Sequence, residues 1–433
     1  MRIQKRRSPA WQDDVLYLPS PYATWELQNN KAVIYTPHRR IGLDEEATEV
    51  FIKIIRRIPV RTGSPAVNRL INKLIKSGVI IPYNPEEPVF FPPAAVAVEI
   101  THRCNLRCKY CYVGNRSNPQ TLSLEAIKHI IDDMRDLQCT TLILGGGEPT
   151  LHPQFDKILE YAYKKGMTTH IVTNGTTDLP DYLEKYSSED RHRFGVTISL
   201  DSPKEIHEEM RKNAKFEIIE RNIHRLAELG WKPSLQTTVS LENYRYIPDL
   251  LKLIKSWPVK SWVFKMEYPV GNAKYRRALF PSSEMFVMIK ERINKWCDES
   301  GINSFSLVDD MGYFPSPMGN GKRRTYYLCS AGVTQVTLDA EGNVTPCTLI
   351  QIADGGSRYI AGNIYEDSLR DIWHRSKVLW DFRLMWPENE ICSSCGLLCA
   401  KCPATVIEMA GDIRKPDPRC SMSCIWGGNG GSS

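Results

Sequence analysis

Between residues 96 and 111 this chain carries the apolar run Val96–Ile100 and then the segment Cys104-Asn-Leu-Arg-Cys108-Lys-Tyr110-Cys111. The apolar run has the length of a buried strand, so the cysteines are expected on the loop that follows it. Three thiolates on one short loop can hold three corners of a cubane iron–sulfur cluster, a group that normally takes four cysteines. Three ligands leave one iron open, as a reaction site requires. A closed zinc site is the alternative, with His102 as the only nearby fourth ligand.

Strand and helix patterns alternate after this loop. Together with the first run, the apolar strand candidates are Val96–Ile100, Thr141–Leu144, Thr169–Thr173, Val196–Leu200, Leu235–Val239 and Trp262–Met266. Stretches with helical periodicity lie between most of them, at Leu124–Leu137, Phe155–Lys165, Glu217–Leu229 and Ile247–Ser256. Ser123 is expected to cap one helix and Gly230 to end another. Six strands with helical crossovers predict an α/β fold, a partial (β/α)6 TIM-like barrel, whose chemistry lies at the C-terminal ends of the strands.

The regions on either side of this pattern differ from it. Residues 1–90 contain no cysteine and read as strand Ala32–Tyr35, helices Asp44–Ile58 and Ala66–Ser77, and strand Val79–Ile81, an order typical of a winged-helix-like α+β module. Residues 281–433 contain helical stretches at Ser283–Cys297 and Leu369–Val378, but turns and cysteines dominate there. We therefore expect three domains, at 1–90, 91–280 and 281–433.

Composition excludes several classes of protein. The chain has 433 residues, a net charge of +6 without a long Lys/Arg block, and no apolar stretch long enough to span a bilayer, so nucleic acid is an improbable partner and no membrane is expected. It has 13 cysteines, an odd number, and no secretory signal, which favours metal ligands in a reducing cytoplasm over disulfides. Cys139 and Cys297 lie among apolar residues and are expected to be buried structural thiols.

The cysteine run resembles the signature of the radical S-adenosylmethionine (SAM) superfamily, including the aromatic Tyr110 before the last cysteine. Further segments fall in the family's order at the ends of the next three strands: Gly146-Gly147-Glu148-Pro149, Thr173-Asn174-Gly175 and Ser199-Leu200-Asp201. The resemblance implies that Cys104, Cys108 and Cys111 bind a 4Fe–4S cluster. It also implies SAM binding by Tyr110, Gly146, Gly147, Glu148, Pro149, Asn174, Ser199 and Asp201. Taken alone, the Gly-Gly-Glu-Pro segment is an ordinary turn, and Ser199–Asp201 is a helix cap.

The C-terminal cysteines resemble the SPASM extension of radical SAM enzymes, which binds two auxiliary 4Fe–4S clusters. The chain reads Cys329-x12-Gly342-x4-Cys347, then Cys392-x2-Cys395-x3-Cys399-x2-Cys402, then Cys420. The middle spacing departs from the family's x2, x5, x3, which weakens the individual assignments of Cys399 and Cys402. By order, the resemblance places Cys329, Cys347 and Cys402 on the first cluster and Cys392, Cys395, Cys399 and Cys420 on the second. The fourth position of the first cluster is either open or taken by Cys424, and a zinc ribbon over residues 392–402 is the alternative.

Residues 15–82 resemble the peptide-recognition module of the pyrroloquinoline-quinone chaperone type, in which a strand edge and a helix clamp a leader peptide. A DNA-binding winged helix is the alternative, because Arg69, Lys73 and Lys76 lie on the second predicted helix. The expected partners are a precursor peptide with a leader and a flavodoxin- or ferredoxin-like reductant.

Together the resemblances imply a radical SAM oxidoreductase that matures a ribosomally made peptide (a RiPP maturase). Reductive cleavage of SAM to a 5′-deoxyadenosyl radical would remove hydrogen from the peptide and lead to a thioether or carbon–carbon cross-link, or a related modification. Alternatives are a sulfatase-type formylglycine maturase, a tetrapyrrole-modifying relative, and a non-catalytic iron–sulfur protein that transfers electrons or binds peptide. No catalytic acid or base can be named. Tyr268, Asp309, Asp310 and Tyr313 are candidates, Arg211 either reaches the SAM carboxylate or is a helix-surface charge, and His207 is expected to be a helix residue.

Overall fold

The structure is a computed structural model. It describes residues 14–20, 22–28, 31–36, 39–55, 57–86, 88, 90–114, 117–186, 188–300, 305–308, 329–384 and 402–418.

The N-terminal segment builds a hydrophobic core of its own around Trp25, Ile34, Phe51 and Leu74. Its elements are β1 (Asp14–Val15), β2 (Tyr17–Pro19), β3 (Thr24–Gln28), β4 (Lys31–Tyr35), β5 (Arg40–Gly42), α1 (Glu45–Ile55), β6 (Val60–Arg61), α2 (Pro65–Lys76) and β7 (Ile80–Pro82). The expected order of strand, two helices and short strand is present as β4, α1, α2 and β7. The structure adds β3 and β5, which pair with β4 on either side in one antiparallel sheet.

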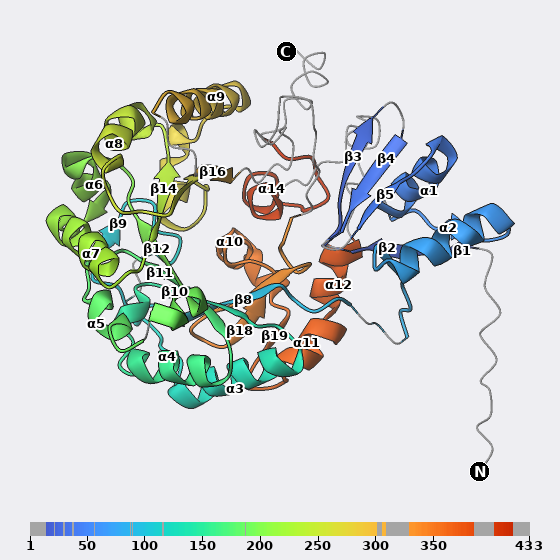
Figure 1. The fold of residues 1–433 in the computed structure, drawn as a ribbon, viewed down its shortest axis with the longest axis horizontal. Coiled ribbons are helices and arrows are strands. Elements are labelled where there is room, and N and C mark those ends of the chain that lie inside the picture. The colour runs from blue at the N-terminus through green and yellow to red at the C-terminus, as the bar shows by residue number, and fades with distance from the viewer. Residues whose placement is uncertain are drawn as a thin grey trace.

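The middle of the chain forms the predicted parallel sheet with helices on its outer side (Figure 1). The strands are β8 (Ala95–Thr101), β10 (Thr141–Gly146), β11 (Thr168–Thr173), β12 (Phe194–Ser199), β14 (Ser234–Val239), β15 (Ser261–Met266) and β16 (Phe305–Val308). The helices are α3 (Leu124–Asp136), α4 (Phe155–Lys164), α5 (Leu179–Leu183), α6 (Lys204–Met210), α7 (Phe216–Glu228), α8 (Ile247–Ile254) and α9 (Ser283–Ser300). All six predicted strands are present and parallel, and β16 adds a seventh.

Strands β10, β11, β12, β14 and β15 bury one face against the helices, and most of the residues between the buried ones are partly exposed. On β15, for example, Trp262 and Phe264 are buried in the main core, whereas Val263 and Lys265 between them are not. Because successive side chains of a strand point to opposite faces, the half-exposed residues line the inside of the barrel. The inside of the barrel is thus lined by partly exposed side chains.

Local signals at the helix ends agree with the sequence. Ser123 accepts a hydrogen bond from the Ala126 N–H at 3.1 Å, as an N-cap does, and Gly230 has a positive φ of 84° directly after the helix that it ends.

The C-terminal region extends the barrel sheet, which sequence periodicity did not predict. Strand β17 (Gln335–Leu338) adds to β8 in parallel, and β18 (Asn343–Thr345) and β19 (Gly362–Asn363) continue the sheet in antiparallel order. The remaining helices are α10 (Thr348–Ile352), α11 (Leu369–Arg375), α12 (Lys377–Leu384) and α14 (Pro403–Ala410). The helical stretch expected at Leu369–Val378 is present as α11 and the start of α12, which the extended backbone of Ser376 separates.

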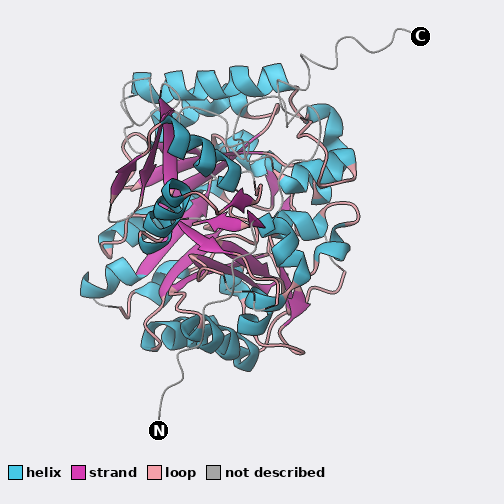
Figure 2. Ribbon diagram, turned by 90° about the vertical axis from the view of Figure 1, so that its right-hand side faces the viewer, coloured by secondary structure: helices cyan, strands magenta, loops and turns pink. Residues whose placement is uncertain are grey.

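The smaller elements are short strands and 3-10 turns. They are β9 (Arg107–Cys108), β13 (Arg211–Lys212), η1 (Pro149–Leu151), η2 (Ser188–Arg193), η3 (Tyr244–Tyr246), η4 (Gly271–Leu279) and η5 (Gly356–Tyr359). Viewed from the side, the strands lie in the middle of the molecule with helices around them (Figure 2). None of the helices within the described ranges has both the length and the apolar character that a bilayer crossing requires.

Helix α12 joins the N-terminal segment to the rest of the molecule. The Arg57 side chain, just after α1, donates a hydrogen bond from Nε to the Arg383 carbonyl oxygen at 3.0 Å. The Tyr83 ring lies 5.0 Å from that of Trp380, also on α12.

Candidate active site

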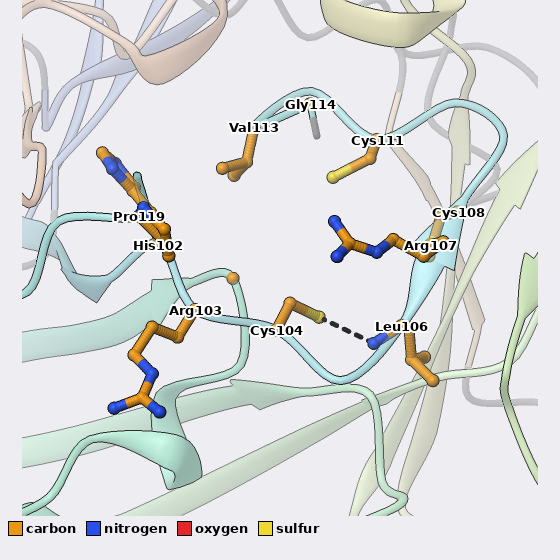
Figure 3. Close-up of a pocket in the computed structure, with 11 residues that line it drawn as sticks. His102, Arg103, Cys104, Leu106, Arg107, Cys108, Cys111, Val113, Gly114 and Pro119 are labelled. Carbon is orange, nitrogen blue, oxygen red and sulfur yellow. Dashed lines mark hydrogen bonds between the residues drawn. The ribbon is translucent and has the colours of Figure 1, made fainter. Parts of the chain in front are cut away.

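The three cysteines of the first motif line one cavity at the C-terminal end of β8. Cys104, Cys108 and Cys111 line a volume of about 150 Å³, and Gly147 also lines it. In Figure 3 the sulfur atoms of Cys104 and Cys111 point into this space, and the Arg107 side chain extends into it between them. The side chain of His102, the fourth ligand of the zinc alternative, is buried and contacts Glu99 at 3.3 Å.

The donor set suits an iron–sulfur cluster. No group of three or more His, Cys, Asp or Glu side chains within the described ranges converges on a point where one metal ion could sit. A cubane, in contrast, offers each thiolate a separate iron, so thiols arranged around a cavity fit it. Burial raises the pKa of all three thiols, that of Cys108 to about 12. Cluster binding requires the thiolate form, so it would release the protons of these thiols.

A buried ion pair fastens the cysteine loop to the barrel. Short strand β9, which contains Cys108, pairs with β13, where Arg211 is directly opposite Cys108. The Arg211 Nε donates to the Asp201 carboxylate at 2.6 Å, and the Tyr110 hydroxyl donates to the same carboxylate. The backbone N–H of Thr238 donates to its other oxygen at 2.9 Å. Asp201 thus joins the loop to the ends of β12 and β14.

The electrostatics of this pair follow from its burial. Burial alone would raise the pKa of Asp201, but the Arg211 guanidinium and the hydrogen bonds outweigh it and hold that pKa below its ordinary value. Burial likewise opposes the charge of Arg211, yet the Asp201 carboxylate raises the Arg211 pKa well above its ordinary value. Both groups are therefore charged at neutral pH. The alternative that Arg211 is a helix-surface charge is wrong, because its side chain is buried.

The Gly-Gly-Glu-Pro segment packs directly against the start of the cysteine loop. Gly146 has a φ of 114°, and a Cβ there would lie 2.3 Å from the Thr101 carbonyl oxygen. A Cβ on Gly147 would lie 2.4 Å from the Arg103 carbonyl oxygen. The N–H groups of Gly147 and Glu148 donate to those two carbonyls at 2.8 Å. Only glycine permits this approach of the two backbones.

Glu148 connects the ends of β10 and β11 by hydrogen bonds. Its fully buried carboxylate accepts hydrogen bonds from the Thr150 and Thr173 hydroxyls, at 2.7 and 2.9 Å, and from the Asn174 N–H at 2.8 Å. Burial outweighs these bonds and raises the pKa of Glu148. Pro149, also buried, begins the 3-10 turn η1 that follows.

The other predicted SAM contacts lie at the same edge of the barrel. The Asn174 amide donates to Asn105 at 2.9 Å and lies 4.0 Å from the Cys104 sulfur. Ser199 ends β12 and is nearly buried. His207 lies on α6, as expected, and its Nδ1 accepts a hydrogen bond from the Asp201 N–H.

Sequence reasoning missed Glu267, a buried carboxylate directly after β15. Its side chain is 7% exposed, its Oε1 lies 3.8 Å from the Arg276 guanidinium, and its Oε2 has no hydrogen-bond partner in the described part of the chain. Burial raises the pKa of Glu267 to about 7, and the neighbouring carboxylates Glu242 and Asp201 add to the shift. The signal available was its place at the end of the last predicted strand. The residues after Glu267 brace the cysteine loop, because the Asn272 N–H donates to the Cys111 carbonyl at 3.0 Å.

Three of the C-terminal cysteines come together in one hydrophobic cluster. Cys329, Cys347 and Cys402 share it with Phe382 of α12 and with Tyr112, the residue after Cys111. Tyr268 belongs to the same cluster. Cys392, Cys395, Cys399, Cys420 and Cys424 lie outside the described residues, as do Asp309, Asp310 and Tyr313. Cys139 and Cys297 are buried, as expected.

Two family models match these two sites. The radical SAM superfamily model covers residues 98–254, and the SPASM model, an iron–sulfur cluster-binding domain, covers residues 329–396. The chain is a radical SAM enzyme with a SPASM domain. Its cofactors are SAM and 4Fe–4S clusters, as the sequence predicted. When bound, they supply a one-electron cleavage of SAM that starts radical chemistry.

Curated relatives cover about three quarters of the chain. An AdoMet-dependent heme synthase of Methanosarcina barkeri is 27% identical over 76% of this chain and 96% of its own length. The mycofactocin maturase MftC of Mycolicibacterium smegmatis is 26% identical over 77% and 84%. The subtilosin biosynthesis protein AlbA of Bacillus subtilis is 28% identical over 67% and 62%.

Solved structures share the fold. SuiB of Streptococcus suis, bound to the precursor peptide SuiA, matches with a TM-score of 0.62 at 17% identity and covers 94% of this chain and 99% of its own. The protein anSMEcpe with bound AdoMet matches with a TM-score of 0.60 at 20% identity, over 77% and 95%. The predicted α/β fold, with a partial barrel and a SPASM region, is thereby confirmed.

Replacing Arg211 with methionine tests the ion pair that holds the cysteine loop. Removing one partner of a buried pair costs about 3–5 kcal/mol, because the other charge stays buried alone. We expect the Arg211→Met protein to hold one cluster fewer per chain than the wild type, measured as iron after anaerobic reconstitution without SAM. The double variant Asp201→Asn/Arg211→Met removes both charges and should recover part of the loss. An equal loss in the single and double variants would contradict the role of the charges.

Replacing Glu267 with glutamine tests its raised pKa. A carboxyl group with a higher pKa in the folded protein binds its proton more tightly there, so stability falls as pH rises from about 4.5 through about 7. The shift corresponds to about 3 kcal/mol at most. We expect nearly equal melting temperatures for wild type and Glu267→Gln at pH 4, and a higher one for the variant at pH 8.5. A difference that does not change with pH would contradict the assignment.

Proposed function

We propose that this chain is a radical SAM peptide maturase that removes hydrogen from a ribosomally made peptide and leads to a thioether or carbon–carbon cross-link, or a related modification. Residues 1–90 would recognise the leader of the precursor peptide, residues 91–280 would bind the catalytic cluster and SAM, and residues 281–433 would hold two auxiliary clusters. A flavodoxin- or ferredoxin-like protein would deliver the low-potential electrons.

The proposal assigns the cofactors to named residues. Cys104, Cys108 and Cys111 would hold the catalytic cluster, while SAM would lie against Tyr110, Gly146, Gly147, Glu148, Pro149, Asn174, Ser199 and Asp201. The auxiliary clusters would take Cys329, Cys347 and Cys402, and Cys392, Cys395, Cys399 and Cys420. The half-open inside of the barrel would admit the peptide to the strand ends, and the buried Glu267 lies at that edge.

The N-terminal sheet is the main observation that favours a peptide as the substrate. Strand β3 pairs with β4 on one side, and no other described strand pairs with it. An unpaired strand edge can bind an extended peptide by adding it as a further strand. Helix α2, which packs against β7 and α1, exposes Arg69, Lys73 and Lys76, so an acidic leader would be attracted to this helix. The likeness to SuiB with its bound precursor peptide, which spans 94% of the chain, supports the same conclusion.

Two other enzyme functions each have one observation in their favour. The heme synthase relatives favour a tetrapyrrole substrate. A tetrapyrrole, however, has no peptide backbone that could pair with an open strand edge. The likeness to anSMEcpe, which was solved with bound AdoMet and a Kp18Cys peptide, leaves another reaction on a peptide, such as the formylglycine type, as the alternative, but this likeness covers only 77% of this chain.

The decisive experiment uses the short peptide encoded beside this chain in its genome. We expect anaerobic incubation with SAM and a reductant to give 5′-deoxyadenosine and a mass loss in the peptide, both measured by mass spectrometry. The Cys104→Ala/Cys108→Ala/Cys111→Ala protein should give neither. SAM cleavage with an unchanged peptide and a converted tetrapyrrole would overturn the proposal, and an absence of SAM cleavage would indicate an electron carrier.

Charge reversal on α2 tests the recognition surface. Each exposed charge contributes up to about 1 kcal/mol, so Arg69→Glu/Lys73→Glu should weaken peptide binding about tenfold, with a smaller effect at high salt. Fluorescence anisotropy of the labelled peptide measures this. Lys252→Glu on α8, an exposed lysine of the barrel, is the matched control and should bind normally. Equal affinity of all three proteins would contradict a role for α2.

A further inference from the structure

Helix α12 carries a buried arginine surrounded by aromatic rings. The side chain of Arg383 is 1% exposed. Its guanidinium carbon lies 4.4 Å from the ring centre of Phe90, 4.3 Å from that of Trp373 and 5.0 Å from that of Trp380. The faces of aromatic rings attract a cation but do not neutralise its charge.

No acidic side chain in the described residues pairs with this arginine. Its Nε donates to the Gly332 carbonyl at 2.9 Å and its Nη1 to the Trp373 carbonyl at 2.7 Å, while its Nη2 has no described partner. Burial lowers the pKa of Arg383 to about 9, so the group is still charged at neutral pH. A buried charge without a counter-ion costs several kcal/mol. Its presence therefore indicates a negative group that completes the site.

The carbonyl group that accepts a hydrogen bond from Arg383 Nε belongs to Gly332, which lies in the sequence between Cys329 and Cys347. Gly332 comes three residues after Cys329, and its N–H donates to the carbonyl of Pro346, the residue before Cys347. A Cβ on Gly332 would touch Phe382 at 3.3 Å and Pro346 at 3.5 Å. Phe382, next to Arg383 in sequence, packs in the hydrophobic cluster that contains Cys329, Cys347 and Cys402. Arg383 thus contacts the loop that carries Cys329, and that loop is hydrogen-bonded to the residue before Cys347.

We propose that Arg383 is the fixed positive charge that compensates the auxiliary cluster of the Cys329–Cys347–Cys402 site and raises its reduction potential. The inference rests on the SPASM assignment within the proposed function, and not on the peptide substrate. A cluster bound by thiolates is negatively charged, and one-electron reduction adds a further negative charge. A cation in a low-dielectric surrounding stabilises the reduced form more than the oxidised form. Net charge near a cluster is one of the factors that set its potential.

The test is an anaerobic redox titration followed by EPR in a protein whose Cys104, Cys108 and Cys111 are replaced by alanine, so that only the auxiliary clusters respond. Arg383→Met removes the charge, and Arg383→Lys keeps the charge but cannot keep both hydrogen bonds and the stacking. We expect one of the two auxiliary potentials to fall in Arg383→Met by about 59 mV or more, a tenfold change in the reduction equilibrium. In Arg383→Lys it should remain near that of the parent protein.

Iron content separates this role from a structural one. A fully loaded Arg383→Met protein that titrates at the parent potential would overturn the proposal. If Arg383→Met and Arg383→Gln both lose one cluster, the iron content of Arg383→Lys shows whether the charge or the side-chain shape is needed. Retention of that cluster by the lysine variant supports the need for charge, whereas its equal loss in all three variants overturns it. The titration uses no peptide, so its result can be interpreted even if the maturase proposal fails.

Discussion

The buried pair of Asp201 and Arg211 is the interaction on which the catalytic site depends. A cysteine loop must present three sulfur atoms in a fixed arrangement. Arg211 meets Cys108 across a two-residue ladder, while Tyr110 and Arg211 both donate to Asp201. The loop is thereby fixed to the ends of two barrel strands. Gly146 and Gly147, at the end of β10, fix the other side of the cysteine loop, because glycine allows the two backbones to come into contact.

The fold was predictable wherever a single strand or helix carries its own signal. Six barrel strands appear in the sequence as short apolar runs, and the cysteine spacing marks the loop after the first strand without any knowledge of distant residues. Strands β17–β19 were not predicted, because they are two to four residues long and form only by pairing with β8 and one another. These strands are determined by the strands with which they pair, and their own residues show no periodicity that would predict them.

The sequence marks candidate ligands, and the structure brings Cys104, Cys108 and Cys111 to one cavity, but the sequence does not mark the residues that support them. Arg211 was left between two interpretations because nothing in its local sequence indicates that Asp201 lies beside it. Glu267 was passed over because its raised pKa arises from burial and from Glu242 and Asp201, which meet it only in the folded chain. Arg383 likewise lies in an ordinary amphipathic helix, and its burial becomes visible only when Phe90 and Trp373 enclose it.

Packing joins the two cysteine sites and the N-terminal sheet. Tyr112, the neighbour of Cys111, packs in the cluster that contains Cys347, and Arg57 of the N-terminal segment donates to the backbone of Arg383. The central claim is that the first three cysteines hold a cluster with one open iron for SAM. Nitrogen-15 ENDOR tests it most directly, on reduced protein with Cys329, Cys347 and Cys392 replaced by alanine and SAM labelled at its amine. The account predicts hyperfine coupling between the label and the cluster; a loaded, reduced cluster without coupling, or zinc in its place, would contradict it.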